Sequence, residues 1–177
     1  MKLKEEYKNL TSDIYANEYF DTLKSDIHHG TNKYAHLRRV SLVSFCLAKI
    51  LKANVKETTR AGLLHDFFFG TRTESNENDY LNHPLTSAKN AKIFFNINDN
   101  EQRIIESHMY HYAYLKKNSP FKQDEVKKYC LIHKPIDKES KIVCLSDLLV
   151  SIYEVSVYKP RYSLTLYTLF LVNIFRY

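Results

Sequence analysis

The sequence predicts an all-α protein, and three observations support this fold class. The 177 residues include only 3 glycines and 4 prolines, too few turn formers for the many short connections of a β-sandwich or barrel. Apolar residues recur at steps of three and four in several segments, which places them on one face of a helix. No alternating strand pattern and no internal repeat stands out. The length and a hydrophobic content of 44% predict one globular domain with a single core.

The N-terminal part is expected to contain two helices joined by a loop. Residues 3–23 predict a charged helix with an aromatic stripe and a break near residues 11–13. Residues 28–32, with the sequence His-His-Gly-Thr-Asn, predict the loop. A strongly periodic helix follows and ends at Asn54. Its inward face is expected to consist of His36, Val40, Val43, Leu47 and Leu51.

Three helices are expected in the middle of the chain. The first spans residues 56–68, and the polar stretch that follows at residues 70–82 is a loop by its composition. Pro84 suits the first position of the second helix, because its missing amide hydrogen costs nothing there. Asp99 and Gln102 predict a capping box at the start of the third helix. The inward residues are, helix by helix, Ala61, Leu64, His65 and Phe68; Leu85, Ala88, Ala91 and Phe95; and Ile104, Ile105, His108 and Tyr112.

The C-terminal part combines an irregular stretch with a long helix. Residues 118–138 are lysine-rich and irregular, and residues 140–158 predict the last strong helix. Ser163 is placed to cap a further helix, and the apolar run at residues 164–175 is too short to span a bilayer, so it predicts packing. The expected organisation is an N-terminal helical extension at residues 1–27, the main domain at residues 28–158, and a C-terminal packing helix of the same globular unit at residues 159–177.

Charge and cysteine content limit the classes of partner and compartment. The formal net charge of +6 favours anionic partners. Lysine and arginine are interleaved with acidic residues in most segments, which argues against a nucleic-acid partner, and no segment predicts a membrane partner. The three cysteines lack paired metal-binding spacing, and Cys46 and Cys144 are expected to be buried. The odd cysteine count and an N-terminus without an export signal predict a cytoplasmic protein.

The adjacent pair His65-Asp66, at the end of an apolar helical run, is the strongest chemical signal in the chain. An imidazole and a carboxylate side by side can offer a neutral nitrogen and a hard oxygen to one cation. Other candidate ligands lie in apolar contexts on separate predicted helices, which lets them converge on one point. The sequence therefore predicts a site for one or two divalent cations that activates water against a phosphoester. The other candidate ligands are His36, His83, His108 and Asp147.

The order of these residues, and the stretches around them, resemble the HD-domain metal-dependent phosphohydrolase superfamily. The two intervening histidines resemble its six-ligand, two-metal branch, and several stretches resemble small bacterial single-domain HD proteins of unassigned substrate. The resemblance covers roughly residues 28–154. The stretches that carry it are His29-Gly30, His36-Leu37-Arg38-Arg39-Val40, Arg60-Ala61-Gly62-Leu63-Leu64-His65-Asp66-Phe67-Phe68, His83-Pro84, Ile104-Ile105-Glu106-Ser107-His108-Met109 and Ile142-Val143-Cys144-Leu145-Ser146-Asp147.

The resemblance implies a role for each candidate ligand. One metal ion would be bound by His36, His65, Asp66 and Asp147, with His65 and Asp66 as the catalytic pair. Asp66 would bridge to a second ion, because a carboxylate has two oxygens and a charge that screens cation repulsion. His83 and His108 would complete the second site. Mixed histidine and aspartate ligation suits iron, manganese, zinc, cobalt or nickel, and magnesium is a further candidate.

The chain departs from the superfamily pattern beside the His-Asp pair. Many members carry a basic residue a few positions later, whereas residues 67–70 here read Phe-Phe-Phe-Gly. Phosphate contacts must therefore come from elsewhere, and Lys33, Arg39 and Arg72 are candidates by position. His29 is placed to contact substrate or to support the site, with a surface loop as the equal alternative. The phenylalanine run is expected in the core, and His111 and His133 at the surface.

Together these features predict a phosphomonoesterase or phosphodiesterase that uses metal-activated water on a small phosphorylated substrate. Nucleotides are the expected substrate class, because the family resemblance and the positive net charge of the chain both favour them. The rival hypothesis is a non-catalytic HD-fold regulatory module that binds a nucleotide or a metal. A helical nucleic-acid-binding protein is a second rival, but it would need a clustered basic face. The exposed aromatic content and the apolar C-terminal segment make a homodimer plausible.

Overall fold

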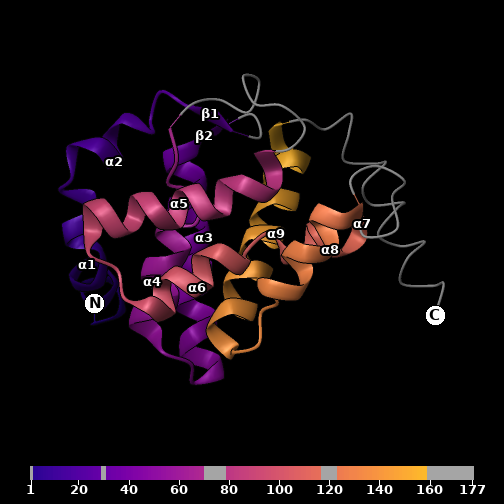
Figure 1. Cartoon of the computed structure of the whole chain (residues 1–177). Coiled ribbons are helices and arrows are strands. Elements are labelled where there is room, and N and C mark those ends of the chain that lie inside the picture. The colour runs from indigo at the N-terminus through magenta and orange to yellow at the C-terminus, as the bar shows by residue number, and fades with distance from the viewer. Residues whose placement is uncertain (1, 29–30, 70–78, 117–122, 159–177) are drawn as a thin grey trace.

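The computed structural model describes residues 2–28, 31–69, 79–116 and 123–158 (Figure 1). Most of these residues are helical, so the all-α prediction is confirmed. Two short strands, β1 (Ile27–His28) and β2 (Thr31–Asn32), pair antiparallel within the stretch predicted as a loop. The helices are α1 (Lys2–Tyr15), α2 (Glu18–Thr22), α3 (Lys33–Leu51), α4 (Val55–Leu64), α5 (Asp79–Phe95), α6 (Asp99–Ser107), α7 (Tyr110–Lys116), α8 (Gln123–Ile132) and α9 (Lys138–Tyr158).

Asparagine residues begin several of these helices. The side-chain oxygen of Asn32 accepts a hydrogen bond from the Ala35 amide at the start of α3, and Asn54 does the same for α4. Asn54 was predicted to end the preceding helix, but α3 already ends at Leu51. At α6 the capping box uses Asn98 and Glu101, so the prediction of the box one residue later was wrong.

The predicted break in the N-terminal helix lies at a different place in the structure. Residues 11–13 are helical, and the Thr11 hydroxyl donates to the Tyr7 carbonyl within α1. The chain turns instead at Ala16 and Asn17, and the Asn17 side chain accepts hydrogen bonds from the first amides of α2. An asparagine outside the helix caps better than a threonine inside it, because its oxygen can reach the orphan amides of the next turn.

The buried face of α3 is rotated from the predicted one. Val43 and Leu47 are half-buried and Leu51 is 48% exposed, whereas Ser41 and Ser44 are fully buried. The two serines face α4, where a Cβ atom on Gly62 would lie 2.9 Å from the Ser44 Oγ. Small polar side chains thus permit the close packing of α3 on α4, which apolar periodicity does not detect. The same rotation exposes Cys46, contrary to the prediction, while Cys144 is buried as predicted.

The middle and C-terminal helices also begin away from the predicted positions. Helix α5 begins at Asp79, so Pro84 lies inside it rather than at its first position, and Leu85 is 39% exposed. Tyr112 lies on α7 and is 37% exposed, because the chain leaves α6 at His108. The stretch predicted as irregular contains α8. The helix predicted from Ser163 lies outside the described residues.

Two buried clusters hold the helices together. The larger cluster is formed by α1 to α6 and α9, with Phe20, Phe67 and Ile104 among its fully buried members. Of the phenylalanine run predicted in the core, only Phe67 is fully buried; Phe68 is half-buried and Phe69 is 47% exposed, so the prediction was wrong for Phe69. The smaller cluster joins α7 and α8 to the start of α5. In Figure 1, α7 and α8 lie on the far side of α9 from α1 and α2, and α5 and α6 cross α3 and α4. No helix among the described residues is long and apolar enough to cross a membrane.

Candidate metal centre

The end of α4 places the His-Asp pair at the centre of the protein. Leu63 and Leu64, the last residues of α4, are fully buried and fix the helix in the core. His65 is the C-terminal cap and Asp66 follows directly, and both are buried, at 0% and 2% exposure. Because the chain leaves the helix here, two consecutive side chains can face the same centre. The local structure therefore supports joint use of the pair by one cation.

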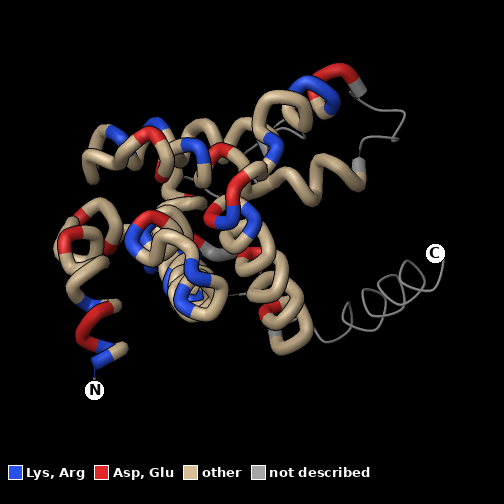
Figure 2. Tube along the Cα trace, turned by 90° about the horizontal axis from the view of Figure 1, so that it is seen from below, with Lys and Arg blue, Asp and Glu red and all other residues tan. Residues whose placement is uncertain are grey.

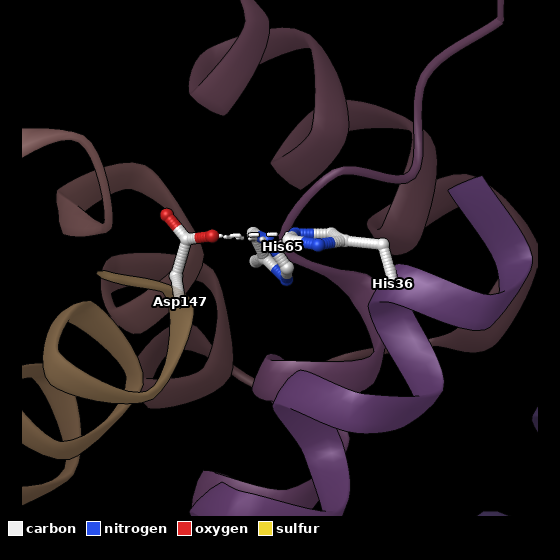
Figure 3. Close-up of side chains that lie close together, drawn as sticks. All are labelled: His36, His65 and Asp147. Atoms are coloured by element: carbon white, nitrogen blue, oxygen red, sulfur yellow. Dashed lines mark ion pairs between the residues drawn. The ribbon is translucent and has the colours of Figure 1, made fainter. Parts of the chain in front are cut away.

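A first group of candidate ligands comes from three helices. His36 of α3, His65 at the end of α4 and Asp147 of α9 offer ligand atoms that all lie within 4.8 Å of one another. The Asp147 Oδ1 lies 3.2 Å from the His36 Nε2 and 3.6 Å from the His65 Nε2. Figure 3 shows one carboxylate oxygen of Asp147 directed toward both imidazole rings. Two imidazole nitrogens and one carboxylate oxygen at this spacing suit a transition-metal cation.

A second group of candidate ligands includes Asp66 and shares His65 with the first. His65, Asp66 and His108 offer ligand atoms within 4.8 Å of one another. The Asp66 Oδ1 lies 3.2 Å from the His83 Nε2 and 3.4 Å from the His108 Nε2, and these two nitrogens are 3.1 Å apart. The other carboxylate oxygen, Oδ2, lies 3.9 Å from the His65 Nε2. Asp66 thus directs one oxygen at His83 and His108 and the other at His65, the residue that both groups share, as a bridging carboxylate would.

The histidine side chains are held so that Nε2 faces the centre. The Nδ1 of His65 lies 3.0 Å from the Gly62 carbonyl, and the Nδ1 of His108 lies 2.7 Å from the Ile105 carbonyl. Carbonyl oxygens only accept hydrogen bonds, so Nδ1 carries the proton and Nε2 is free to coordinate. The His65 Nε2 is buried and makes no hydrogen bond within the described part of the chain. The donor set therefore fits a divalent cation.

Electrostatics keep the candidate ligands in the protonation states that a cation requires. Burial alone would raise the pKa of Asp66, but the neighbouring imidazoles of His83, His65 and His108 outweigh it and hold this pKa well below its ordinary value. The pKa of Asp147 is likewise well below its ordinary value, because His36 and His65 outweigh the burial. Burial lowers the pKa of His108 to about 4. At neutral pH both carboxylates are ionised and His108 is neutral.

His36 differs, because two carboxylates face it. Burial lowers its pKa, but hydrogen bonds and charges from Asp147 and Glu154 outweigh this and raise the pKa from 6.5 to about 9. In the metal-free protein both nitrogens of this imidazole are therefore protonated at neutral pH. A cation that binds at Nε2 must displace the proton on that nitrogen, so binding there is favoured by higher pH.

The metal-free protein is expected to lose about 2 kcal/mol of unfolding free energy between pH 7 and pH 9 through His36. The folded-state pKa of His36 is raised above the unfolded value of 6.5, so its contribution is fully present below pH 6.5 and is lost as the pH rises through about 9. Urea unfolding in the presence of a chelator measures the change. A His36→Gln variant is the control, and its stability should lack this slope; an equal slope in both proteins would contradict the assignment.

The predicted substrate residues have different surroundings. His29 and Arg72 lie outside the described residues. The Lys33 side chain is buried, and its Nζ lies 3.2 Å from the Asp26 Oδ2 and donates to the Phe68 carbonyl at 2.8 Å. Its amine also lies 3.7 Å from the centroid of the Phe68 ring. Through these contacts the Lys33 amine stabilises the fold. A role for it in phosphate binding stays a prediction.

Three further residues differ from the expectations or were not expected. Glu154 of α9 is fully buried; its Oε2 lies 2.9 Å from the His36 Nδ1, and its Oε1 accepts from the Arg39 Nη1 at 2.7 Å. The seven-residue step from Asp147, two helical turns, could have indicated Glu154. His111 is half-buried; burial lowers its pKa, and the charge of Asp147 opposes this. His133 is half-buried beside Glu106, so the surface prediction for both was wrong.

The fold and the site define a class: an all-helical protein whose central helices present buried imidazoles and carboxylates to a shared cation position. The family model of the HD domain matches residues 34–151, two thirds of the chain. The chain belongs to the HD-domain family, whose members are generally metal-dependent hydrolases. No curated protein and no solved structure matches the chain.

Proposed function

We propose that the protein is a metal-dependent phosphohydrolase that acts on a nucleotide, as a phosphomonoesterase or phosphodiesterase. The single observation that carries the proposal is the buried Asp66 carboxylate, whose Oδ1 faces the imidazoles of His83 and His108 while its Oδ2 faces that of His65. Family membership supports hydrolysis, and the buried, mixed nitrogen and oxygen donor set supports a cation as its agent.

The residues of the site would divide the work of the reaction. His36, His65 and Asp147 would hold one cation, His83 and His108 a second, and Asp66 both. A bound cation supplies a water of lowered pKa as nucleophile and a positive charge against the phosphoryl oxygens. The protein's own part is to keep the carboxylates ionised and the imidazoles oriented through their Nδ1 atoms. Hydrolysis then cleaves the P–O bond with the oxygen of water, and the leaving group takes up a proton.

Electrostatics of the surface support a small anionic substrate over a polynucleotide. The net charge of +6 favours anions, but Figure 2 shows lysine and arginine interspersed with aspartate and glutamate along the helices. A polynucleotide needs a continuous basic stripe, whereas a nucleotide needs only local contacts. The regulatory-module hypothesis is less well supported, because a module that only senses a ligand does not need this whole set of candidate metal ligands.

Elemental analysis of the purified protein, followed by assay of a nucleotide panel, tests the proposal. We expect one or two transition-metal ions per chain and release of phosphate or nucleoside from at least one nucleotide. Removal of the metal with a chelator is expected to abolish release, and adding the metal back to restore it. Protein that contains metal but hydrolyses no nucleotide would favour the regulatory module. Protein that binds no divalent cation would overturn the proposal.

A further inference from the structure

Three of the candidate ligand histidines have Nδ1 contacts of two different kinds. His65 and His108 each lie at the end of a helix, where a carbonyl three residues earlier faces the Nδ1. The last carbonyls of a helix have spare acceptor capacity, so they can accept from these imidazoles. His36 lies in the first turn of the 19-residue helix α3, and the carbonyls around it are engaged in the helix. Its Nδ1 therefore needs an acceptor from another element.

Helix α9 supplies that acceptor. The Glu154 Oε2 lies 2.9 Å from the His36 Nδ1, and both residues are fully buried. Asp147, two turns earlier on the same helix, faces the other nitrogen of the same ring at 3.2 Å. The ring is thus fixed at both ends by α9, with one carboxylate on the cation side and one on the side away from it.

A buried carboxylate needs a compensating charge, and Arg39 provides it. Arg39 lies one helical turn after His36 on α3, and its Nη1 donates to the Glu154 Oε1 at 2.7 Å. Each oxygen of Glu154 therefore has its own partner: Oε1 binds the arginine and Oε2 the imidazole. This division fixes the orientation of the Glu154 carboxylate while it accepts from His36.

We infer that Glu154 is a positioning residue of the metal centre: it keeps the His36 proton on Nδ1 and thereby directs the Nε2 lone pair at the cation. The inference rests on the proposed metal site, not on the substrate or the reaction. A carboxylate behind a coordinating imidazole also increases the basicity of that ligand, which a carbonyl does less strongly. The His36 side of the site should therefore depend on Glu154 for its affinity.

The contribution of Glu154 is measured as the zinc affinity of purified protein that has first been stripped of metal. Zinc is the probe, titrated against a competing chelator, because it suits this donor set and is diamagnetic. Glu154→Gln is expected to weaken zinc binding at the tightest site by about 10- to 100-fold, as loss of such supporting partners does. The Gln side chain keeps the shape but loses the charge that balances the imidazole.

Glu101→Gln is the matched control. Glu101 is also a buried glutamate paired with an arginine, at 3.0 Å between the Arg60 Nε and its Oε1, but it lies outside the candidate metal centre. We expect this variant to lower stability and to leave zinc affinity unchanged. Equal zinc affinity in Glu154→Gln and the wild type overturns the inference, while a wild type that binds no zinc overturns the proposed metal site instead.

Nitrogen-15 NMR of the histidine side chains in the zinc-loaded wild type gives a second readout that does not depend on any variant. We expect the His36 ring to carry its proton on Nδ1 and to bind zinc through Nε2. If Glu154→Gln does not fold, this spectrum still decides: zinc on Nδ1, or a His36 ring without zinc beside zinc-bound His65, overturns the inference.

Discussion

Asp66→Asn is expected to lower the rate of phosphate release by about 1,000-fold, the upper end of what loss of one charge-stabilising group costs. The variant keeps the size of the side chain but loses the negative charge that faces His83 and His108 through Oδ1 and His65 through Oδ2. A neutral amide cannot screen the repulsion between two cations. The rate is measured with the best nucleotide of the panel, and the metal content by elemental analysis of the same samples.

Asp99→Asn is the control for this substitution, since the Asp99 side chain is 97% exposed on α6 and remote from the centre. It should retain full activity and full metal content. If Asp66→Asn retained activity within threefold of the wild type, with its fold intact by circular dichroism, the role of Asp66 at the centre of the reaction would be wrong.

Arg60→Met is expected to lower the free energy of unfolding by about 3–5 kcal/mol, the usual cost of removing one partner from a buried ion pair. The guanidinium is mostly buried and joins α4 to α6 and α1: its Nε donates to the Glu101 Oε1 at 3.0 Å, and its Nη1 to the Asp13 Oδ1 at 2.6 Å and the Leu10 carbonyl at 3.1 Å. Without it, the Glu101 carboxylate remains buried without a compensating charge. Urea unfolding of both proteins under the same metal conditions measures the loss.

Arg103→Met is the matched comparison, because Arg103 pairs with Asp137 while its own side chain is 47% exposed. Exposed pairs contribute less than about 1 kcal/mol, so this variant should be nearly as stable as the wild type. Adding Glu101→Gln to Arg60→Met should recover part of the loss, since it removes the uncompensated charge. Equal stability of the two arginine variants would show that the buried position of Arg60 contributes nothing.

The helical class and the candidate ligands could be predicted because both depend on local features of the sequence. Scarcity of glycine and proline excludes many short turns, and the His65-Asp66 pair is adjacent in the chain, so no fold is needed to bring its members together. The six candidate ligands lie together in the structure for a related reason. Each lies in the sequence next to an apolar helical face, and apolar faces meet in the core.

Helix faces and boundaries were less predictable where small or polar residues decide the packing. The face of α3 is set by Ser41 and Ser44 against Gly62, a contact between residues with no apolar side chain to count. The starts of α2, α4 and α6 depend on which of several nearby polar residues reaches the free amides. Which residue becomes the cap depends on whether its side-chain oxygen comes within hydrogen-bond distance of those amides, which the sequence does not show.

The sequence alone determined which residues can coordinate a cation, since ligand chemistry belongs to the side-chain type and its place on a helix. Only the tertiary structure decided how those ligands are held. Glu154 lies 118 positions after His36, and Arg60 lies 41 positions before Glu101, yet each pair is in direct contact. A buried charge is stable only beside its partner, and no pattern within a single helix shows which distant partner the fold will bring to it.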